Sequence, residues 1–205
     1  MSILATDNFN RANANPIDGA WATITSEQPI CISSNVARET SLGADCASRN
    51  TGATYPNDQY AQAKCSGGNN SSADEGVGML VRGASAARTY YRLIMSQGST
   101  NAYLSKKVSG TYTNIWGRVK AWADGNTIRL EAQGTTLRGF VNGSQIGADQ
   151  TDSAIASGNP GLATSSSLSG ATGATWDDFE GGDFGTGVPA LTMTLAEPVL
   201  MDTPF

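Results

Sequence analysis

The alternation of apolar and charged positions is clearest over residues 126–147, NTIRLEAQGTTLRGFVNGSQIG. Its first part holds apolar residues on one face and charged residues on the other: Ile128, Leu130 and Ala132 against Arg129 and Glu131. A period of two residues is typical of a β-strand with one buried and one solvated face. Gln133-Gly134-Thr135 and Asn142-Gly143 provide residues that favour tight turns. The segment therefore predicts a meander of three antiparallel strands.

Short runs of the same kind recur along the chain, separated by spacers rich in turn-forming residues. Besides the meander, we expect strands over Ile3–Asn10, Ala20–Thr25, Ile30–Arg38, Ala44–Arg49, Gln59–Ser66, Gly76–Arg82, Tyr90–Ser96, Ala102–Val108, Ile115–Ala121 and Thr175–Gly181. The last three spacers cover residues 66–75, 109–114 and 165–173. Because no window has a long apolar period of 3.6, helices should be few and short. The pattern predicts an all-β domain of two antiparallel sheets.

Several of these segments resemble the concanavalin A-like lectin/glucanase superfamily, including its laminin-G-like members. The meander, GNPGLAT at Gly158 to Thr164 and WDDFEGG at Trp176 to Gly182 follow that family's order of strands and turns. TDNFNRANA from Thr6, followed by Trp21, resembles the opening strand, and GVGMLVRG and YYRLIMS resemble the central strands. The resemblance implies a jelly-roll sandwich over residues 1–182, with Trp21 and Trp176 in its core. It spans a very broad superfamily and therefore implies the fold more than a function.

Composition and charge narrow the classes of partner. The 205 residues fit a single domain. A net charge of −5 and a charged fraction of 15% argue against nucleic acid, whose phosphates need clustered Lys and Arg. The chain has no apolar run near the ~20 residues that span a bilayer. Its first residues, MSILATDNF, lack the basic start and apolar core of a signal peptide. We therefore expect no membrane partner and no export by a leader visible in the sequence.

The three cysteines, Cys31, Cys46 and Cys65, cannot all pair within one chain. An odd number favours thiols that act as small apolar side chains in a reducing compartment. A Cys46–Cys65 or a Cys31–Cys65 disulfide stays open as an alternative. Zinc is disfavoured because the chain has no His and no C-x-x-C pair.

Catalytic residues are not evident in the sequence. Hydrolases of the resembling family carry E-x-D-x-x-E or E-x-D-x-x-x-E on one strand, which places the carboxylates together on one face. No glutamate here opens such a motif, and Glu131 stands alone in its strand. Asp177 and Asp178 are adjacent, so we expect their side chains on opposite faces. Without His, Ser–His and Cys–His nucleophiles are excluded. We expect a protein that is not an enzyme.

The resemblance also points to two kinds of ligand site, one for calcium and one for sugar. In each case the alternative is that the residues have only a structural role. Many relatives hold a structural Ca²⁺ between the opening and closing strands, which by position points to Asp7, Asp177 and Asp178. No cofactor is required. Glycan binding needs exposed aromatic rings, and Tyr103 and Trp116 are the candidates.

Two further expectations concern a pair of aspartates and a pair of adjacent tyrosines. A calcium-dependent sugar site at Asp149 and Asp152 is a weaker alternative. Tyr90 and Tyr91, being adjacent in a strand, should lie on opposite faces.

The chain changes character after Gly182, where residues 183–205 form a proline-containing arm. Its apolar residues are the candidate partner-binding residues: Leu191, Met193, Leu195, Val199, Leu200, Met201 and Phe205. We expect the arm to bind neighbouring protein subunits, by adding a strand or an apolar plug; packing along its own domain is the main alternative, and disorder is the remaining one.

Together these features favour a non-enzymatic viral structural protein of the phage kind, located in the virion, such as a capsid decoration or tail-associated subunit assembled in the host cytoplasm. That step is by analogy with phage proteins that resemble lectin jelly rolls. A carbohydrate-binding module, secreted for host or polysaccharide recognition, is the alternative function.

Overall fold

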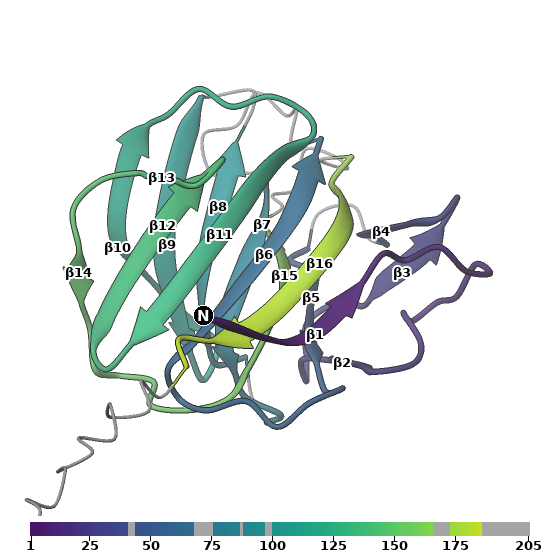
Figure 1. Ribbon diagram of the computed structural model, residues 1–205, viewed down its shortest axis with the longest axis horizontal. Coiled ribbons are helices and arrows are strands. Elements are labelled where there is room, and N and C mark those ends of the chain that lie inside the picture. The colour runs from purple at the N-terminus through teal and green to yellow at the C-terminus, as the bar shows by residue number, and fades with distance from the viewer. Residues whose placement is uncertain (41–43, 68–75, 87, 97–99, 166–172, 186–205) are drawn as a thin grey trace, which may run out of the picture.

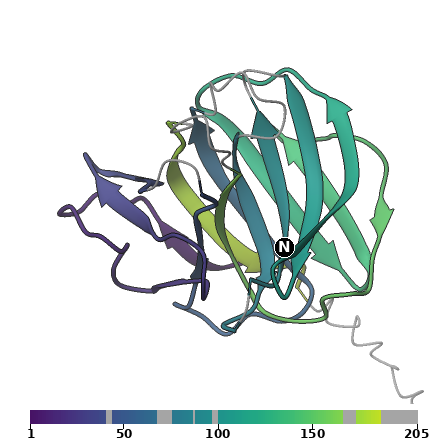
Figure 2. The same ribbon diagram turned by 180° about the vertical axis from the view of Figure 1, so that it is seen from behind.

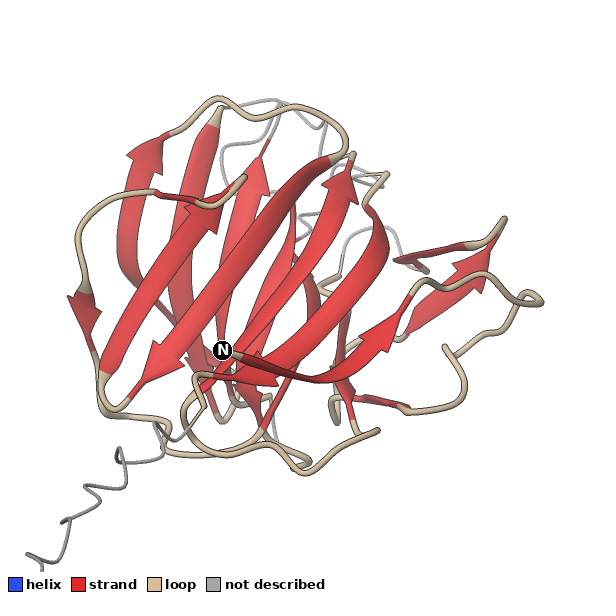
Figure 3. Cartoon of the chain, viewed as in Figure 1, coloured by secondary structure: helices blue, strands red, loops and turns tan. Residues whose placement is uncertain are grey.

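The computed structural model describes residues 1–40, 44–67, 76–86, 88–96, 100–165 and 173–185. Within these ranges the chain forms sixteen strands in two antiparallel sheets and no helix, as Figure 3 shows. The expected all-β jelly-roll sandwich is confirmed. The apolar residues predicted to bind partners, from Leu191 to Phe205, lie outside the described residues, as does the arm from residue 186 onward.

Sheet A faces the viewer in Figure 1 and has nine strands. They are β1 (Ser2–Asp7), β3 (Ile30–Ser33), β4 (Val36–Glu39), β6 (Gln59–Ser66), β11 (Asn126–Gln133), β12 (Thr136–Val141), β13 (Ser144–Gln145), β14 (Gln150–Thr151) and β16 (Thr175–Asp183). Their order is β13-β12-β11-β6-β16-β4-β3, with β1 also paired to β16 and β14 to β12. The first and last described strands therefore lie side by side.

Sheet B lies behind sheet A in Figure 1 and faces the viewer in Figure 2. Its seven strands are β2 (Trp21–Thr23), β5 (Ala47–Asn50), β7 (Gly76–Gly83), β8 (Tyr90–Ser96), β9 (Asn101–Val108), β10 (Thr111–Val119) and β15 (Asn159–Ser165). Their order is β10-β9-β8-β7-β15-β5-β2, so the four strands from the middle of the chain form one continuous antiparallel run.

The main core fills the space between the sheets. Leu93 of β8 and Leu130 of β11 are fully buried in it, because alternate residues of each strand point inward. Trp176 donates a hydrogen bond from its indole nitrogen to Gly78 O at 2.9 Å. The ring of Trp21 meets Phe179 edge-on, with centroids 4.7 Å apart. Both tryptophans belong to the core, as expected from the resemblance.

A second apolar cluster lies on the outer face of sheet B. It consists of Ile24, Ala47, Leu80, Tyr90, Ile94 and Ala163. Residues 24–28 cover this cluster: Ile24 N donates to Ala47 O, and Gln28 N donates to Asp45 O. Tyr90 belongs to this outer cluster and Tyr91 to the main core, so the expected split is confirmed. Sheet B is therefore partly buried on both faces.

Two strand predictions need correction. The strand expected over Ile30–Arg38 is a hairpin, because Ser34 and Asn35 adopt φ of 57° and 63° and form its turn. The spacer expected over residues 109–114 is only a two-residue turn at Ser109-Gly110. β10 consequently begins at Thr111, four residues before the predicted start.

The three cysteines are unpaired, with Cys46 and Cys65 buried and Cys31 half-buried. Burial raises the pKa of the Cys65 thiol, which disfavours the reactive thiolate. No helix long and apolar enough to cross a membrane occurs in the part of the chain that the structure describes.

Candidate functional site

The outer face of β8, β9 and β10 carries accessible aromatic rings above buried charges. Strand pairing arranges its residues in three rows: Tyr90–Lys107–Tyr112, Arg92–Ser105–Asn114 and Ile94–Tyr103–Gly117. We call these nine residues the tyrosine face. It lies on the side of the sandwich that is turned toward the viewer in Figure 2.

Tyr112 is the most accessible ring of the tyrosine face. The residue is 45% exposed, whereas Arg92 is only 4% exposed. The guanidinium carbon of Arg92 lies 5.4 Å from the centre of the Tyr112 ring, within the range of a cation–π contact. Arg92 therefore supports the ring from the protein side.

Tyr103 lies on the same face and is half-buried. A Cβ atom at Gly117 would come within 3.1 Å of two carbons of the Tyr103 ring. Since glycine has no such atom, the ring rests directly on the neighbouring strand. Both tyrosines are thus held in place by groups beneath or beside them.

A network of buried charges lies next to the rings. Lys107 Nζ is 2.8 Å from Glu27 Oε1 and 2.7 Å from Asp45 Oδ2. Arg92 Nη1 is 2.7 Å from the same oxygen of Asp45. Tyr90 donates its hydroxyl hydrogen to Glu27 Oε1 at 2.9 Å. These bonds connect β8 and β9 to the loops that hold Glu27 and Asp45.

The charge network also affects ionisation at Arg92. Burial alone lowers the pKa of Arg92, but the nearby Asp45 carboxylate, together with Tyr90 and Tyr112, offsets this and the pKa is raised. The guanidinium therefore stays charged beneath Tyr112.

A depression of about 310 Å³ adjoins the network. Its lining residues are Ser26, Glu27, Gln28, Ala44, Asp45, Arg88 and Lys107. Lys107 is paired directly with Tyr112 across β9 and β10. Arg88 donates from Nε to Ser26 O at 2.8 Å and is partly exposed. The depression thus offers donors and acceptors at one end of the tyrosine face.

Trp116, the other ring predicted to bind sugar, lies elsewhere. It is paired with Leu104, whose side chain belongs to the main core. A Cβ at Gly147 would come within 2.3 Å of the Trp116 ring, so the ring packs tightly against that glycine. The structure therefore does not bring Tyr103 and Trp116 onto one platform.

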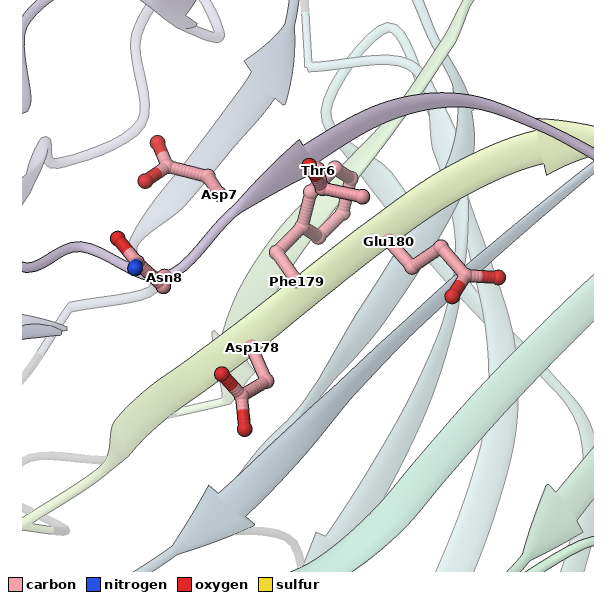
Figure 4. A pocket seen from close by; sticks show the side chains of 6 residues that line it. All are labelled: Thr6, Asp7, Asn8, Asp178, Phe179 and Glu180. Carbon is pink, nitrogen blue, oxygen red and sulfur yellow. The ribbon is translucent and has the colours of Figure 1, made fainter.

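The residues predicted to hold calcium lie partly together. Asp7 and Asp178 line a cleft of about 420 Å³ between β1 and β16, shown in Figure 4, and Asp177 is not among its lining residues. Asp7 already accepts three hydrogen bonds, from Phe9 N, Arg11 Nη1 and Trp21 Nε1 at 2.7–2.8 Å.

Asp178 is bound to a lysine. Its Oδ2 is 2.6 Å from Lys64 Nζ. Asp178 has φ of 50° at an irregularity of β16, and its backbone N–H donates to Asp177 Oδ1. No group of three or more His, Cys, Asp or Glu suited to a metal occurs among the described residues. The calcium site stays a prediction.

Asp149 and Asp152, the weaker calcium-dependent sugar candidates, are each bound to a cation. Asp149 Oδ2 is 2.9 Å from Arg138 Nε, and Asp152 Oδ2 is 2.5 Å from Lys106 Nζ. Hydrogen bonds from Gln145 and Arg138 lower the pKa of Asp149. Burial opposes ionisation of Asp152, yet hydrogen bonds from Lys106 and Tyr91 lower its pKa.

Two carboxylates share the outer face of sheet A, but on different strands. Glu131 on β11 is nearly buried, and its Oε1 lies 3.0 Å from Arg129 Nε. Burial raises the pKa of Glu131. Glu180 on β16 accepts a hydrogen bond from Tyr60, which lies on β6 between these two strands.

Sequence reasoning missed most of the tyrosine face. Tyr112 fell in an expected spacer, although TYT at residues 111–113 has the alternation of a strand. No sequence pattern marks Arg92 as a buried residue. Glu27 and Asp45 come from loops, and no local pattern indicates that they meet Lys107.

Comparison with known proteins shows similarity in structure alone. No protein-family model matches the sequence, and no curated protein matches it. A carbohydrate-binding module, CBM66 from Bacillus subtilis, superposes with a TM-score of 0.56 and 14% identity over 80% of this chain and 92% of the module. A β-glucanase from Bacillus licheniformis gives 0.56 and 11% over 89% of this chain and 99% of the enzyme.

A third similar structure is a GH43 protein from Bacillus licheniformis. It superposes with a TM-score of 0.63 and 12% identity, over 87% of this chain and 39% of that protein. Such identities show a shared fold and no more. The chain has the concanavalin A-like, galectin-like jelly-roll fold.

Proposed function

We propose that this protein is a non-catalytic carbohydrate-binding module and that the tyrosine face is its binding surface. The observation that carries the proposal is the presence of two supported tyrosine rings, Tyr103 and Tyr112, on one face of neighbouring strands. Such rings offer apolar area with a polar edge, which matches the faces and hydroxyls of a sugar.

The polar groups beside the rings complement the proposal. Asn114 is exposed in the middle row, between the rows that hold the two tyrosines. Lys107 and Arg88 provide donors and Glu27 and Asp45 provide acceptors around the adjoining depression. Because sugar hydroxyls both donate and accept hydrogen bonds, a mixed lining suits them better than a lining of one kind.

The fold is compatible with this function but does not determine it. The similar structures include a carbohydrate-binding module as well as a β-glucanase, and one fold supports many activities. The proposal therefore depends on the tyrosines and their surroundings. A glycan array, followed by titration calorimetry on its best oligosaccharide, tests it.

We expect the double variant Tyr103→Ala/Tyr112→Ala to lose measurable binding to that oligosaccharide. Phe140→Ala, an aromatic substitution on the outer face of sheet A, is the matched control and should bind as the unchanged protein does. Equal binding by all three proteins, or an array without any hit, would refute the proposal.

The absence of catalysis is part of the proposal and has its own test. Glu27 is bound to both Lys107 and Tyr90, and Asp45 to both Lys107 and Arg92. Both carboxylates are therefore already engaged by protein groups, which leaves neither of them placed to pass a proton to a substrate. Release of reducing sugar from a panel of β-glucans should stay at the background rate; turnover that depends on Glu27 would contradict this part.

We propose, as a second function, that the arm makes the protein a structural subunit of a phage particle, as expected from the sequence. β16 is paired on both sides, with β6 on one and with β1 and β4 on the other. A further strand from the arm would therefore need a different edge, either an end strand of its own sheets or, as proposed here, a sheet edge of a neighbouring subunit. At about 25 cal/mol per Å², burial of the arm's apolar residues would contribute strongly to assembly.

Light scattering after size-exclusion chromatography tests this second function. The full chain should form oligomers that depend on concentration, and a chain ending at Gly185 should be a folded monomer. Identical masses for the two proteins over the whole concentration range would refute the role of the arm. Neither outcome affects sugar binding at the tyrosine face.

A further inference from the structure

A second cleft lies at the end of the sandwich where β6 begins and β11 and β16 end, the lower end in Figure 1. Residues 56–58, 133–135, 153–156 and 183–185 surround it. It consists of two hollows of about 430 and 330 Å³, which share Asn57 and Asp58. We call this pair of hollows the loop-end cleft.

Arg82 holds three of these loops in place. Its side chain is 3% exposed. The guanidinium donates to Asn57 O at 2.9 Å, to Ile155 O at 2.9 Å and to Gly134 O at 2.7 Å. One buried side chain thereby fixes the spacing of three loops that are far apart in the sequence.

Gln59 and Tyr91 fix the same loops from other directions. Gln59 donates from Nε2 to Pro56 O at 2.7 Å and to Gly158 O at 2.9 Å. Tyr91 donates to Asp152 Oδ1 at 2.6 Å, and its hydroxyl oxygen accepts from Ile155 N at 3.0 Å. A cleft whose walls are already fixed loses little conformational entropy when a ligand binds.

The backbone is strained at the same place. Arg82 has φ of 53°, an uncommon conformation for a residue with a long side chain. Gly158 has φ of 140°, and a Cβ there would lie 2.4 Å from the Arg82 carbonyl carbon. The surrounding hydrogen bonds maintain this strained crossing, and such strain is concentrated at functional sites.

The larger hollow combines an apolar wall with polar groups. Pro56 and Phe184 form the apolar part, and Asn57, Asp58, Gln133 and Asp183 are the polar lining residues. The Phe184 ring lies 6.3 Å from the ring of Tyr60, measured between centroids. An aromatic ring beside amide and carboxylate groups is a lining that suits a sugar residue.

The two carboxylates of the larger hollow each use one oxygen inside the protein. Asp58 Oδ1 accepts from Gly134 N at 2.7 Å, and Asp183 Oδ1 accepts from Gly185 N at 2.8 Å. For the other oxygen of each carboxylate, the described residues provide no hydrogen-bond donor. These oxygens are therefore available to accept from ligand hydroxyls.

We infer that the loop-end cleft is a second binding site and that it takes the terminal residue of a neutral glycan. The inference rests on the proposed function, since it assumes that sugars are the ligands. A hollow of about 430 Å³, bounded by loops on several sides, suits one chain-end residue, whereas the tyrosine face extends over three strands and suits a length of chain. Acidic sugars are disfavoured because the carboxylates of Asp58 and Asp183 line the hollow, and the Arg82 guanidinium is already bound to backbone carbonyls and lies 3.7 Å from Asp58 Oδ1.

Titration of ¹⁵N-labelled full-length protein with single sugars tests the inference. The probes are glucose, galactose, mannose and N-acetylglucosamine, with glucuronate as the acidic comparison. At least one neutral probe should shift the amide signals of Asn57, Asp58, Gly134 and Gly185. Glucuronate should bind there at least about tenfold more weakly.

Variants separate the two sites. Phe184→Ala and Asp58→Asn should each weaken binding at the loop-end cleft by about tenfold, whereas Tyr112→Ala should leave it unchanged. The Asp58→Asn change keeps the side-chain volume, so it tests the site even if the loss of Phe184 disturbs the fold.

The result that overturns the inference is a loop-end cleft whose signals respond to none of the neutral probes, or respond equally to glucuronate. If the array oligosaccharide still shifts signals of the tyrosine face, the proposed function stands and only the second site is lost. If neither region responds to any sugar, both fail.

Discussion

On the outer face of sheet A a cation covers an aromatic ring, whereas on the outer face of sheet B a cation lies beneath one. On sheet A, Arg129 lies over the Phe140 ring at 4.4 Å, and Tyr60 is only 1% exposed. On sheet B, Arg92 is buried and the Tyr112 ring above it is accessible. The two faces have the same period-two alternation but present different chemistry to solvent.

The difference shows how a sheet face can be protected or made available for binding. A cation that covers a ring keeps its apolar area from solvent, because the stem of an arginine packs along it. A cation beneath a ring leaves that area accessible and holds the ring in position. We therefore assign recognition to sheet B and a protective surface to sheet A, and the following predictions test that assignment.

The largest effect should come from removing the buried cation of sheet B. Arg92→Ala leaves Asp45 with only one of its two cationic partners, in a nearly buried position. Loss of one member of a buried ion pair typically costs about 3–5 kcal/mol. Urea unfolding should show that the variant has lost unfolding free energy of this order.

The control for this experiment is Lys64→Ala on sheet A. Lys64 and its partner Asp178 are both more than half exposed, and exposed pairs contribute little. It should have no measurable effect on unfolding. Equal losses for the two variants would mean that the charges of sheet B are not structurally distinct from those of sheet A.

Trp116→Ala should have the next largest effect, on stability rather than on binding. The ring packs against the core at the edge of the sandwich and against Gly147. If Trp116 were completely buried, its replacement by Ala would lower the unfolding free energy by about 3–5 kcal/mol. Because Trp116 is half-buried, we expect a loss of roughly 2 kcal/mol. Thermal unfolding measures the stability of the variant, and calorimetry with the array oligosaccharide measures its sugar binding. Specific loss of sugar binding with unchanged stability would restore Trp116 as a binding residue.

Substitutions at Tyr112 should separate the ring from the hydroxyl. Aromatic contacts contribute about 0.5–1.5 kcal/mol beyond area burial, so Tyr112→Ala should weaken sugar binding roughly three- to tenfold. Tyr112→Phe keeps the ring and should stay within about twofold of the unchanged protein. A loss with Phe as large as that with Ala would show that the hydroxyl, not the ring face, carries recognition.

The smallest effect concerns the pH dependence of sheet A. Burial raises the pKa of Glu131 above 4.5. A raised folded-state pKa gives a contribution to stability that is complete below the unfolded value and is lost as pH rises through the folded value. As pH rises above about 4.5, the unchanged protein should therefore lose unfolding free energy relative to the Glu131→Gln variant. A difference that is constant between pH 4 and 7 would contradict this assignment.

The sequence predicts regular strands well and predicts loops that meet in space poorly. The strand from Asn126 to Gln133 forms as expected, since Ile128, Leu130 and Ala132 are fully buried in the core. The Ser34-Asn35 turn was missed because neither residue is a glycine or proline, although both adopt positive φ. Local pattern identifies alternation but not every turn.

The candidate site was predictable only in part. Alternation places Tyr103 on a strand, yet its face depends on which neighbours it pairs with, and the bulge in β10 near Ile115 changes the register. Burial of Arg92 results from loops that bring Asp45 across the outer face, 47 residues away in the sequence. Such contacts between distant segments leave no local signal, and they determine whether a charged residue is solvated or buried.

The most direct test of the account is a map of where the best oligosaccharide from the array binds on the ¹⁵N-labelled protein. The account predicts that the amide signals of β8, β9 and β10 shift, with Tyr103, Tyr112 and Asn114 among the most affected. Shifts confined to the outer face of sheet A, around Arg129 and Phe140, would contradict it.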